Sequence, residues 1–133
     1  MKPVFLDTVG LLALWDTSDQ WHPSAEKAFA EFQADRRPLV TTSLVLFECG
    51  NAASRRPYRL IVPQLWRSLE TASGLVHPNS DDVRSAWDAY RRGDADGAGV
   101  VDHVSFIVMR RLGLSDAFTN DRHFRAAGLS PCF

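Results

Sequence analysis

The chain is poor in cysteine, in lysine and in long hydrophobic runs, and each shortage excludes a class of protein. Its two cysteines, Cys49 and Cys132, show neither metal-binding nor redox spacing. No apolar run approaches the ~18 residues that span a bilayer, so no membrane association is expected. The apolar N-terminal stretch is interrupted by Asp7 and lacks a small-residue cleavage site, so it is not expected to be a signal peptide. These absences predict a reduced, cytoplasmic protein.

Net charge is also small, at −1, so composition alone does not indicate a nucleic-acid partner. The glycines at 93, 97 and 99 match neither the phosphate-binding loop nor the dinucleotide fingerprint. Arginine forks suit phosphate, and many arginines stand in pairs: Arg36-Arg37, Arg55-Arg56, Arg91-Arg92 and Arg110-Arg111. Each pair taken alone is interpreted as a solvated helix end, and the sequence leaves open whether the pairs converge.

Short apolar runs alternate with helical patterns along the whole chain. The runs that indicate strands are 4–6, 39–41, 74–76 and 117–119, with an edge strand near 129–133. Helical patterns follow each run, with Pro23 and Pro63 expected at helix starts and Thr42 or Ser43 as a cap. The alternation predicts one α/β domain over residues 1–133, in which a mainly parallel sheet lies between two helical layers.

Two segments in the second half receive more specific predictions. Ser80 is expected to cap a helix with a buried stripe, followed by a loop over 93–99; the stripe is Val83, Ala86, Trp87 and Tyr90. A strongly apolar helix is then expected from about residue 100 to Arg111, and Gly113 is suited to end it because glycine accepts the left-handed conformation.

Four acids occupy matching places in this pattern. Asp7 and Asp121 each follow a short apolar strand, while Glu48 and Asp102 each lie early in an apolar helix. The carboxyl ends of parallel strands share one edge of a sheet, where ligands bind. We therefore expect the four carboxylates to meet at that edge.

Carboxylates in such number repel one another unless a cation lies between them, and hard oxygen ligands suit Mg²⁺ or Mn²⁺. Thr8 and Thr119 stand beside two of the acids and are expected to orient ligands or water. Asn51 lies three residues after Glu48, so its amide is expected to hold that carboxylate. The competing interpretation is that acids near strand ends are ordinary loop residues or helix caps.

Other polar residues near these acids are given lesser roles. Asp94 and Asp96 are interpreted as solvated loop acids, with an auxiliary role left open. His103 directly follows Asp102, but adjacent residues on a helix do not face each other, which argues against a catalytic triad. For His123, a surface or packing role is favoured over substrate contact.

Several short motifs occur in an order typical of one nuclease family. They are FLDT at the start, Glu48 in LVLFECGNA, Asp102 in VVDHVSFIVMRRLG, and the Thr-x-Asp of FTNDRHF. Together they resemble the PIN-domain nucleases, and more narrowly the VapC toxins of VapBC toxin–antitoxin systems. The resemblance covers nearly the whole chain. Two positions depart from it, since valines stand at 9 and 101, where the family commonly has small polar residues.

The resemblance implies a three-layer α/β/α PIN-like fold and a metal-dependent endoribonuclease that leaves a 5′-phosphate and a 3′-hydroxyl. Asp7 and Asp102 would be the main ligands of Mg²⁺ or Mn²⁺, and Glu48 and Asp121 would complete the cluster. RNA would be the substrate and a small VapB-like antitoxin the inhibitor. A homodimer is also implied, with an apolar interface or core role for Tyr58, Leu65, Trp66 and Leu69.

Two rival functions remain at this point. A catalytically silent PIN-like module would bind RNA or protein without cutting, but it has no need of all four acids. A Mg²⁺-dependent phosphatase or receiver domain would use an aspartyl phosphate, and no acid pair stands beside Asp7 to match it.

Overall fold

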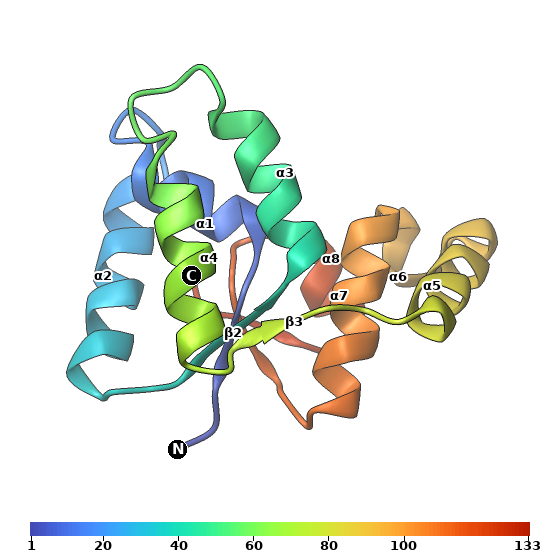
Figure 1. The fold of residues 1–133 in the computed structure, drawn as a ribbon. Coiled ribbons are helices and arrows are strands. Elements are labelled where there is room, and N and C mark those ends of the chain that lie inside the picture. Colours follow the sequence, from blue (N-terminus) through green and yellow to red (C-terminus); the bar gives the residue numbers. More distant parts are fainter.

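Residues 1–133 are described by a computed structural model with five strands and eight helices (Figure 1). In chain order they are β1 (Val4–Leu6), α1 (Thr8–Trp15), α2 (His22–Ala34), β2 (Leu39–Thr42), α3 (Ser43–Ala53), α4 (Ile61–Thr71), β3 (Leu75–Val76), α5 (Ser80–Arg92), α6 (Asp94–Gly97), α7 (Val100–Arg111), β4 (Asp116–Phe118), α8 (Arg122–Ala126) and β5 (Ser130–Pro131).

The strands form one sheet in the order β3-β2-β1-β4-β5, and every neighbouring pair is parallel. The expected mainly parallel sheet is confirmed, including the edge strand at the C-terminus. Helices α1 to α4 contact one another on one side, and α5 to α8 on the other (Figure 1). The predicted α/β/α layering is therefore confirmed.

The strand order reverses direction next to β1, and this reversal creates the site. The chain runs outward from β1 through β2 to β3, and then returns to place β4 on the other side of β1. Crevices form at such switch points, outside the carboxyl ends of the strands. Asp7 directly follows β1, and Asp121 lies three residues after the end of β4. The topology thus brings together two acids that are 114 positions apart in sequence.

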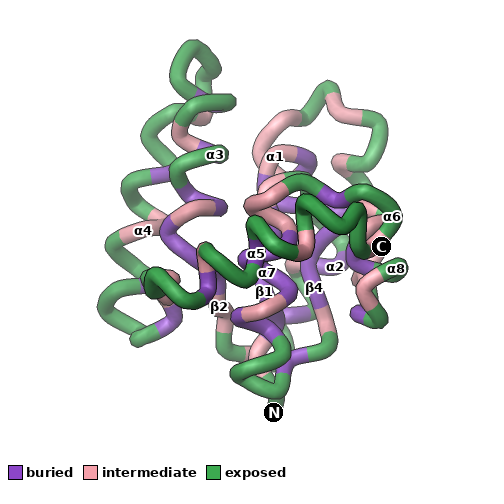
Figure 2. The backbone as a smooth tube through the Cα atoms, turned by 90° about the vertical axis from the view of Figure 1, so that its right-hand side faces the viewer, coloured by how far each residue is buried: buried purple, intermediate pink, exposed green.

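Aromatic and aliphatic side chains fill the space between the sheet and its helices. Burial is concentrated along the central strands and the helix faces turned toward them (Figure 2). Phe118 of β4 lies within 6 Å of the ring centres of Phe29, Phe32 and Phe133. Each fully buried side chain of this size stabilises the fold by roughly 1.5–3 kcal/mol. No helix has both the length and the hydropathy needed to cross a membrane.

Helix boundaries confirm some sequence predictions and correct others. The Thr42 side chain caps α3 by accepting from the Val45 backbone, and Gly113 follows α7 with a positive φ of 69°. The predicted Ser80 cap is wrong, because Asn79 caps α5 in a reciprocal capping box with Asp82. The segment expected to be a loop over 93–99 contains the short α6.

The predicted buried stripe of α5 is only partly correct. Ala86 is fully buried, but Trp87 and Tyr90 are 50% and 51% exposed. Their rings pack edge to face at the helix surface, 5.3 Å apart. The reason is that α5 lies outside α7, which it contacts along one side only. The short α6 also contacts α5, and neither neighbour covers Trp87 or Tyr90.

Backbone contact between α1 and the end of β4 fixes where the site begins. A Cβ atom at Gly10 would lie 2.0 Å from the Phe118 carbonyl oxygen. Only glycine permits this approach, which brings the start of α1 against the strand that leads to Asp121. Asp7 contacts the same carbonyl group, since its backbone N–H donates to the Phe118 oxygen at 3.4 Å.

Substituting Gly10 by alanine is expected to destabilise the protein by roughly 1–3 kcal/mol, because α1 must move away from β4. Gly50 in α3 is the matched control, since its nearest neighbour to an added Cβ is 3.9 Å away. Gly50→Ala should stabilise the protein by roughly 0.5–1 kcal/mol through helix propensity. Urea unfolding of both variants measures the difference. Equal effects in the two would contradict the close contact.

Candidate active site

An open pocket at the carboxyl edge of the sheet collects all four acids expected there. The pocket has a volume of about 630 Å³. We call it the acidic pocket; it is lined by Asp7, Thr8, Val9, Glu48, Asn51, Ala52, Asp102 and Asp121. Its walls come from the start of α1, the middle of α3, the first turn of α7 and the segment after β4.

Asp7 is the deepest of the four acids. It is only 2% exposed, and its Oδ2 accepts a hydrogen bond from Thr119 Oγ1 at 2.8 Å. It precedes α1 but its side chain caps no helical N–H. Burial, reinforced by the nearby charge of Asp102, raises the pKa of Asp7 to about 8. The Asp7 side chain therefore does not stabilise the start of α1, and its burial disfavours the ionised carboxylate.

Asp102 lies in the first turn of α7 and likewise makes no cap hydrogen bond, since the cap position is Gly99. Burial raises its pKa to about 7, with further contributions from the charges of Asp121 and Glu48. The helix-cap interpretation is therefore wrong for Asp7 and Asp102. Positive charge entering the pocket would favour the charged form of both carboxylates.

Glu48 is held from the opposite wall. The Thr8 hydroxyl donates to Glu48 Oε1 at 2.7 Å, which links α1 to α3 across the pocket. The hydrogen bond expected from Asn51 is not formed; Asn51 lines the pocket without holding Glu48. The offset of three residues on a helix brings side chains near each other, but the tertiary neighbour Thr8 is the better-placed donor.

Asp121 has two roles at once. It is the cap of α8, since its Oδ1 accepts from the His123 backbone N–H at 2.9 Å. The helix-cap interpretation is correct here, yet the same residue lines the acidic pocket. Thr119 connects it to Asp7, because the Thr119 hydroxyl accepts from the Asp121 backbone N–H at 3.1 Å.

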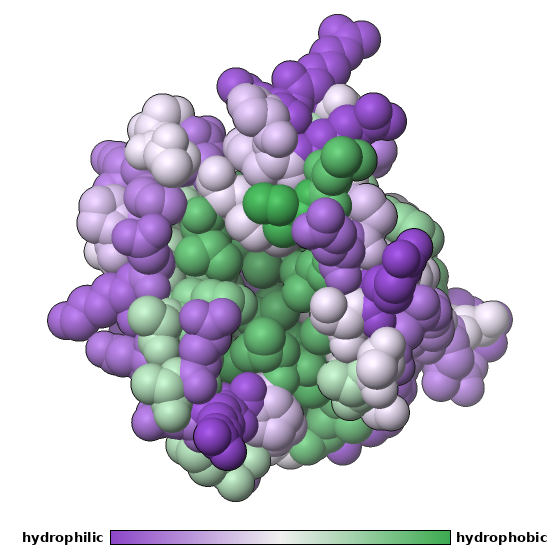
Figure 3. All heavy atoms as spheres, turned by 60° about the vertical axis from the view of Figure 1, so that its left-hand side comes forward, coloured by the Kyte–Doolittle hydropathy of each residue, from purple (hydrophilic) through white to green (hydrophobic).

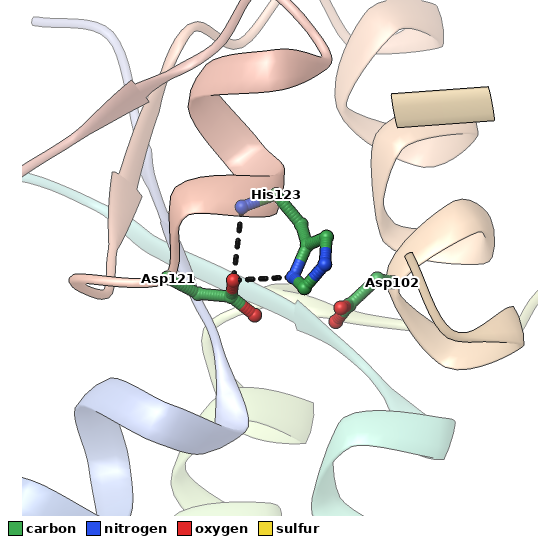
Figure 4. A group of neighbouring side chains, drawn as sticks. All are labelled: Asp102, Asp121 and His123. Atoms are coloured by element: carbon green, nitrogen blue, oxygen red, sulfur yellow. Dashed lines mark hydrogen bonds and ion pairs between the residues drawn. The ribbon is translucent and has the colours of Figure 1, made fainter. Parts of the chain in front are cut away.

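His123 joins the cluster, although the sequence favoured a surface or packing role for it. Its Nδ1 lies 2.7 Å from Asp121 Oδ1, and Figure 4 shows the ring between Asp121 and Asp102. One ligand atom from each of these three residues lies within 4.8 Å of the others. The sequence feature that could have indicated this role is the position of His123, two residues after Asp121. Asp121 caps α8, and the first turn of that helix brings the His123 ring back toward it.

These donors fit a divalent cation. Two of the carboxyl groups have pKa values raised by burial and mutual repulsion, which a cation would reverse. Oxygen donors predominate, as Mg²⁺ and Mn²⁺ require. Cys49 supplies no thiolate, because burial raises its pKa to about 12.

Several other candidate residues lie outside the pocket. Asp94 pairs with Arg92 at 2.8 Å, and Asp96 pairs with Arg122. His103 is buried and packs edge to face on Phe106, so no triad with Asp102 exists. The arginine pairs are divided among separate partners; Arg37 binds Asp116, Arg91 binds Asp88, and Arg111 binds Asp82.

Apolar surface flanks the acidic pocket. A neighbouring groove between α3 and α4 has a volume of about 670 Å³ and shares Asn51 with the acidic pocket. Its walls include Phe47, which is 58% exposed and stacks on Trp66, and the exposed Leu60. Figure 3 shows hydrophobic side chains gathered in a hollow on the side that carries α2 and α4.

The residues proposed from the sequence for an apolar interface are divided between core and surface. Leu69 is buried in the core, whereas Tyr58, Leu65 and Trp66 are partly buried against it. Tyr58 packs against Trp15, with ring centres 6.2 Å apart. Part of this set therefore remains accessible to a partner.

Comparison with known proteins gives relatives of consistent kind. No family model matches the sequence. The proteins named 23S rRNA-specific endonuclease VapC20 from two Mycobacterium tuberculosis strains are 33% identical over 127 residues, covering 94% of each chain. The crystal structure of M. tuberculosis VapC20, described as a sarcin-ricin loop cleaving toxin, matches with a TM-score of 0.77 at 28% identity. That match covers 95% of both chains.

Substituting Asp102 by asparagine is expected to raise the melting temperature of the metal-free protein. A carboxyl group with a raised pKa loses stability as pH rises from its ordinary 3.8 through its folded value of about 7. Asp102→Asn has no carboxyl group at this position, so its stability does not fall with pH for this reason. Its advantage should be near zero at about pH 4 and reach roughly 1–2 kcal/mol, or about 3–8 °C, by about pH 8. Melting curves in EDTA measure the effect.

Asp88→Asn is the control, because Asp88 lies on the exposed surface of α5 and pairs with Arg91. Its melting temperature should stay close to that of the wild type at every pH. Mg²⁺ should raise the wild-type melting temperature, since it binds the folded state, and Asp102→Asn should lose most of that rise. An Asp102→Asn protein that melts lower in EDTA and keeps its full Mg²⁺ shift would remove Asp102 from the site.

Proposed function

This chain belongs to the VapC family of endoribonuclease toxins, and we propose that its acidic pocket is the active site, in which Asp7 and Asp102 hold Mg²⁺ or Mn²⁺. As a family member it is the toxin of a toxin–antitoxin pair and a hydrolase of RNA. The observation that carries the site assignment is the convergence of four carboxylates, two of them with raised pKa values, in one open pocket.

Each residue of the pocket has a distinct task in this proposal. Asp7 and Asp102 are the main ligands, and Thr119 fixes Asp7 by its 2.8 Å hydrogen bond. Glu48, held by Thr8, and Asp121 complete the cluster directly or by orienting water. When bound, the cation supplies Lewis acidity toward the phosphate and lowers the pKa of the attacking water. The open mouth of the pocket admits a phosphodiester backbone from outside.

The substrate we propose is a structured ribosomal RNA. The relatives' names specify 23S rRNA and the sarcin-ricin loop, and the present chain covers nearly their whole length. The catalytically silent alternative has no support, because the pocket keeps all four acids and holds two of them with hydrogen bonds from threonines.

The partner we propose is a small VapB-like antitoxin that places an arginine in the acidic pocket. An arginine fork pairs bidentately with carboxylates and would supply the missing positive charge. The apolar groove between α3 and α4 adjoins the pocket at Asn51 and can seat an apolar segment of the same partner. A homodimer remains part of the proposal, with the accessible aromatic surface near Tyr58 and Trp66 available to it.

Cleavage of RNA by the purified, antitoxin-free protein should require a divalent cation. We expect cleavage of 23S rRNA with Mg²⁺ or Mn²⁺, none in EDTA, and recovery when the metal is restored. Asp7→Asn should lower the rate by at least roughly 100-fold, because a main ligand is lost. Asp94→Asn should cleave normally, because Asp94 pairs with Arg92 outside the pocket. Undiminished cleavage in EDTA or by Asp7→Asn would contradict the proposal.

Growth of cells that express the protein should slow, and co-expression of the antitoxin should restore it. Glu48→Gln should abolish the growth arrest, because it removes one charge from the pocket and leaves the shape of the side chain nearly unchanged. Optical density and immunoblotting measure growth and protein level together. Arrest that persists at equal protein levels with Glu48→Gln would show that toxicity arises elsewhere.

A further inference from the structure

One imidazole, that of His123, lies beside two acids of the acidic pocket, Asp102 and Asp121. The ring lies between Asp121 and Asp102 (Figure 4), and a ligand atom from each of the three residues lies within 4.8 Å of the others. The residue is only partly accessible, with 24% of its side chain exposed. Phe124, the next residue, is fully buried and anchors α8 in the core, so the ring is placed by a fixed helix start.

The hydrogen bonds around the ring decide which nitrogen is available. Asp121 Oδ1 accepts from the His123 backbone N–H at 2.9 Å and lies 2.7 Å from His123 Nδ1. An ionised carboxylate only accepts, so Nδ1 is the donor in this contact. A neutral ring that donates from Nδ1 keeps a lone pair on Nε2. A carboxylate behind one ring nitrogen and a free lone pair on the other is the usual arrangement of a metal-ligating histidine.

We propose that His123 Nε2 is a direct ligand of the cation in the acidic pocket, and that the pocket therefore favours a first-row transition metal ion over Mg²⁺. This inference rests on the proposed function of the pocket. Mg²⁺ takes oxygen ligands almost exclusively, whereas imidazole nitrogen suits transition metal ions. The four acids alone offer only oxygen ligands, and His123 would add a nitrogen ligand to this set.

No other histidine can supply this nitrogen. His103 packs against Phe106 and is buried away from the pocket. His22 contacts the Ala13 carbonyl and Glu26. His77 lies against the edge of Trp66. A nitrogen signal on a bound metal ion would therefore identify His123.

Electron spin-echo envelope modulation of bound Mn²⁺ tests the ligation directly. The full-length, antitoxin-free protein with one equivalent of Mn²⁺ should show nitrogen-14 modulation from imidazole. Labelling with nitrogen-15 histidine should change that modulation in the wild-type protein, with no substitution needed. His123→Asn should abolish it, and the matched control His77→Gln should retain it. Absence of the signal in the wild type, or its persistence in His123→Asn, would overturn the assignment.

Calorimetric titration measures the preference of the site for Mn²⁺ over Mg²⁺. The ratio of the Mg²⁺ Kd to the Mn²⁺ Kd should fall by roughly 10-fold or more in His123→Asn, because the lost imidazole nitrogen favours a transition metal ion over Mg²⁺, and should not change in His77→Gln. An unchanged ratio would contradict the inference. A wild-type protein that binds neither ion would instead contradict the proposed function. Binding that requires Asp102 but shows no nitrogen modulation would leave the acidic pocket intact and remove only His123.

Discussion

Repulsion among the carboxylates gathered in one pocket is the constraint on which the structure of the site depends. Asp7 is almost fully buried, and the charges of Asp102 and Asp121 both act on it. No basic side chain lines the pocket, so the remainder of the molecule must hold the acids together. Two threonine hydroxyls hold individual carboxylates, and the aromatic core around Phe118 stabilises the strands that carry them.

Thr119 shows how closely the site and the fold are joined. Its hydroxyl donates to Asp7 and accepts from the Asp121 backbone, so one group links the ends of β1 and β4. Asp121 in turn caps α8, and the ring of its cap partner His123 lies close to both Asp121 and Asp102. The chemistry of the site and the start of a helix thus use the same few atoms. A substitution at Thr119, or at Thr8, which holds Glu48, would remove a hydrogen bond that fixes the position of a carboxylate.

Much of this arrangement was predictable from the sequence, because it depends on periodicity and topology. Short apolar runs that end in Asp7 or precede Asp121 locate the strands, and parallel strands bring those acids to one edge. The relatives independently support the family that the motifs indicated.

The predictions that failed depend on tertiary neighbours. Spacing along a helix suggested Asn51 for Glu48, whereas Thr8 makes the hydrogen bond from another helix. Trp87 was expected to be buried, but the helices that contact α5, which are α7 and the short α6, leave it half exposed. The place of His123 depends on the exact residue at which α8 begins, and sequence patterns do not fix helix starts to one residue.

The contact at Gly10 has a consequence for how such an enzyme is controlled. Helix α1 lies against the Phe118 backbone with no room for a methyl group at Gly10. The segment that carries Asp7 and Thr8 is therefore tightly packed against the end of β4. Closing the site by rotating α1 would disrupt this contact. A molecule that occupies the mouth of the pocket would block the site and leave this contact intact. The rate at which that molecule dissociates would then set how fast the enzyme is released.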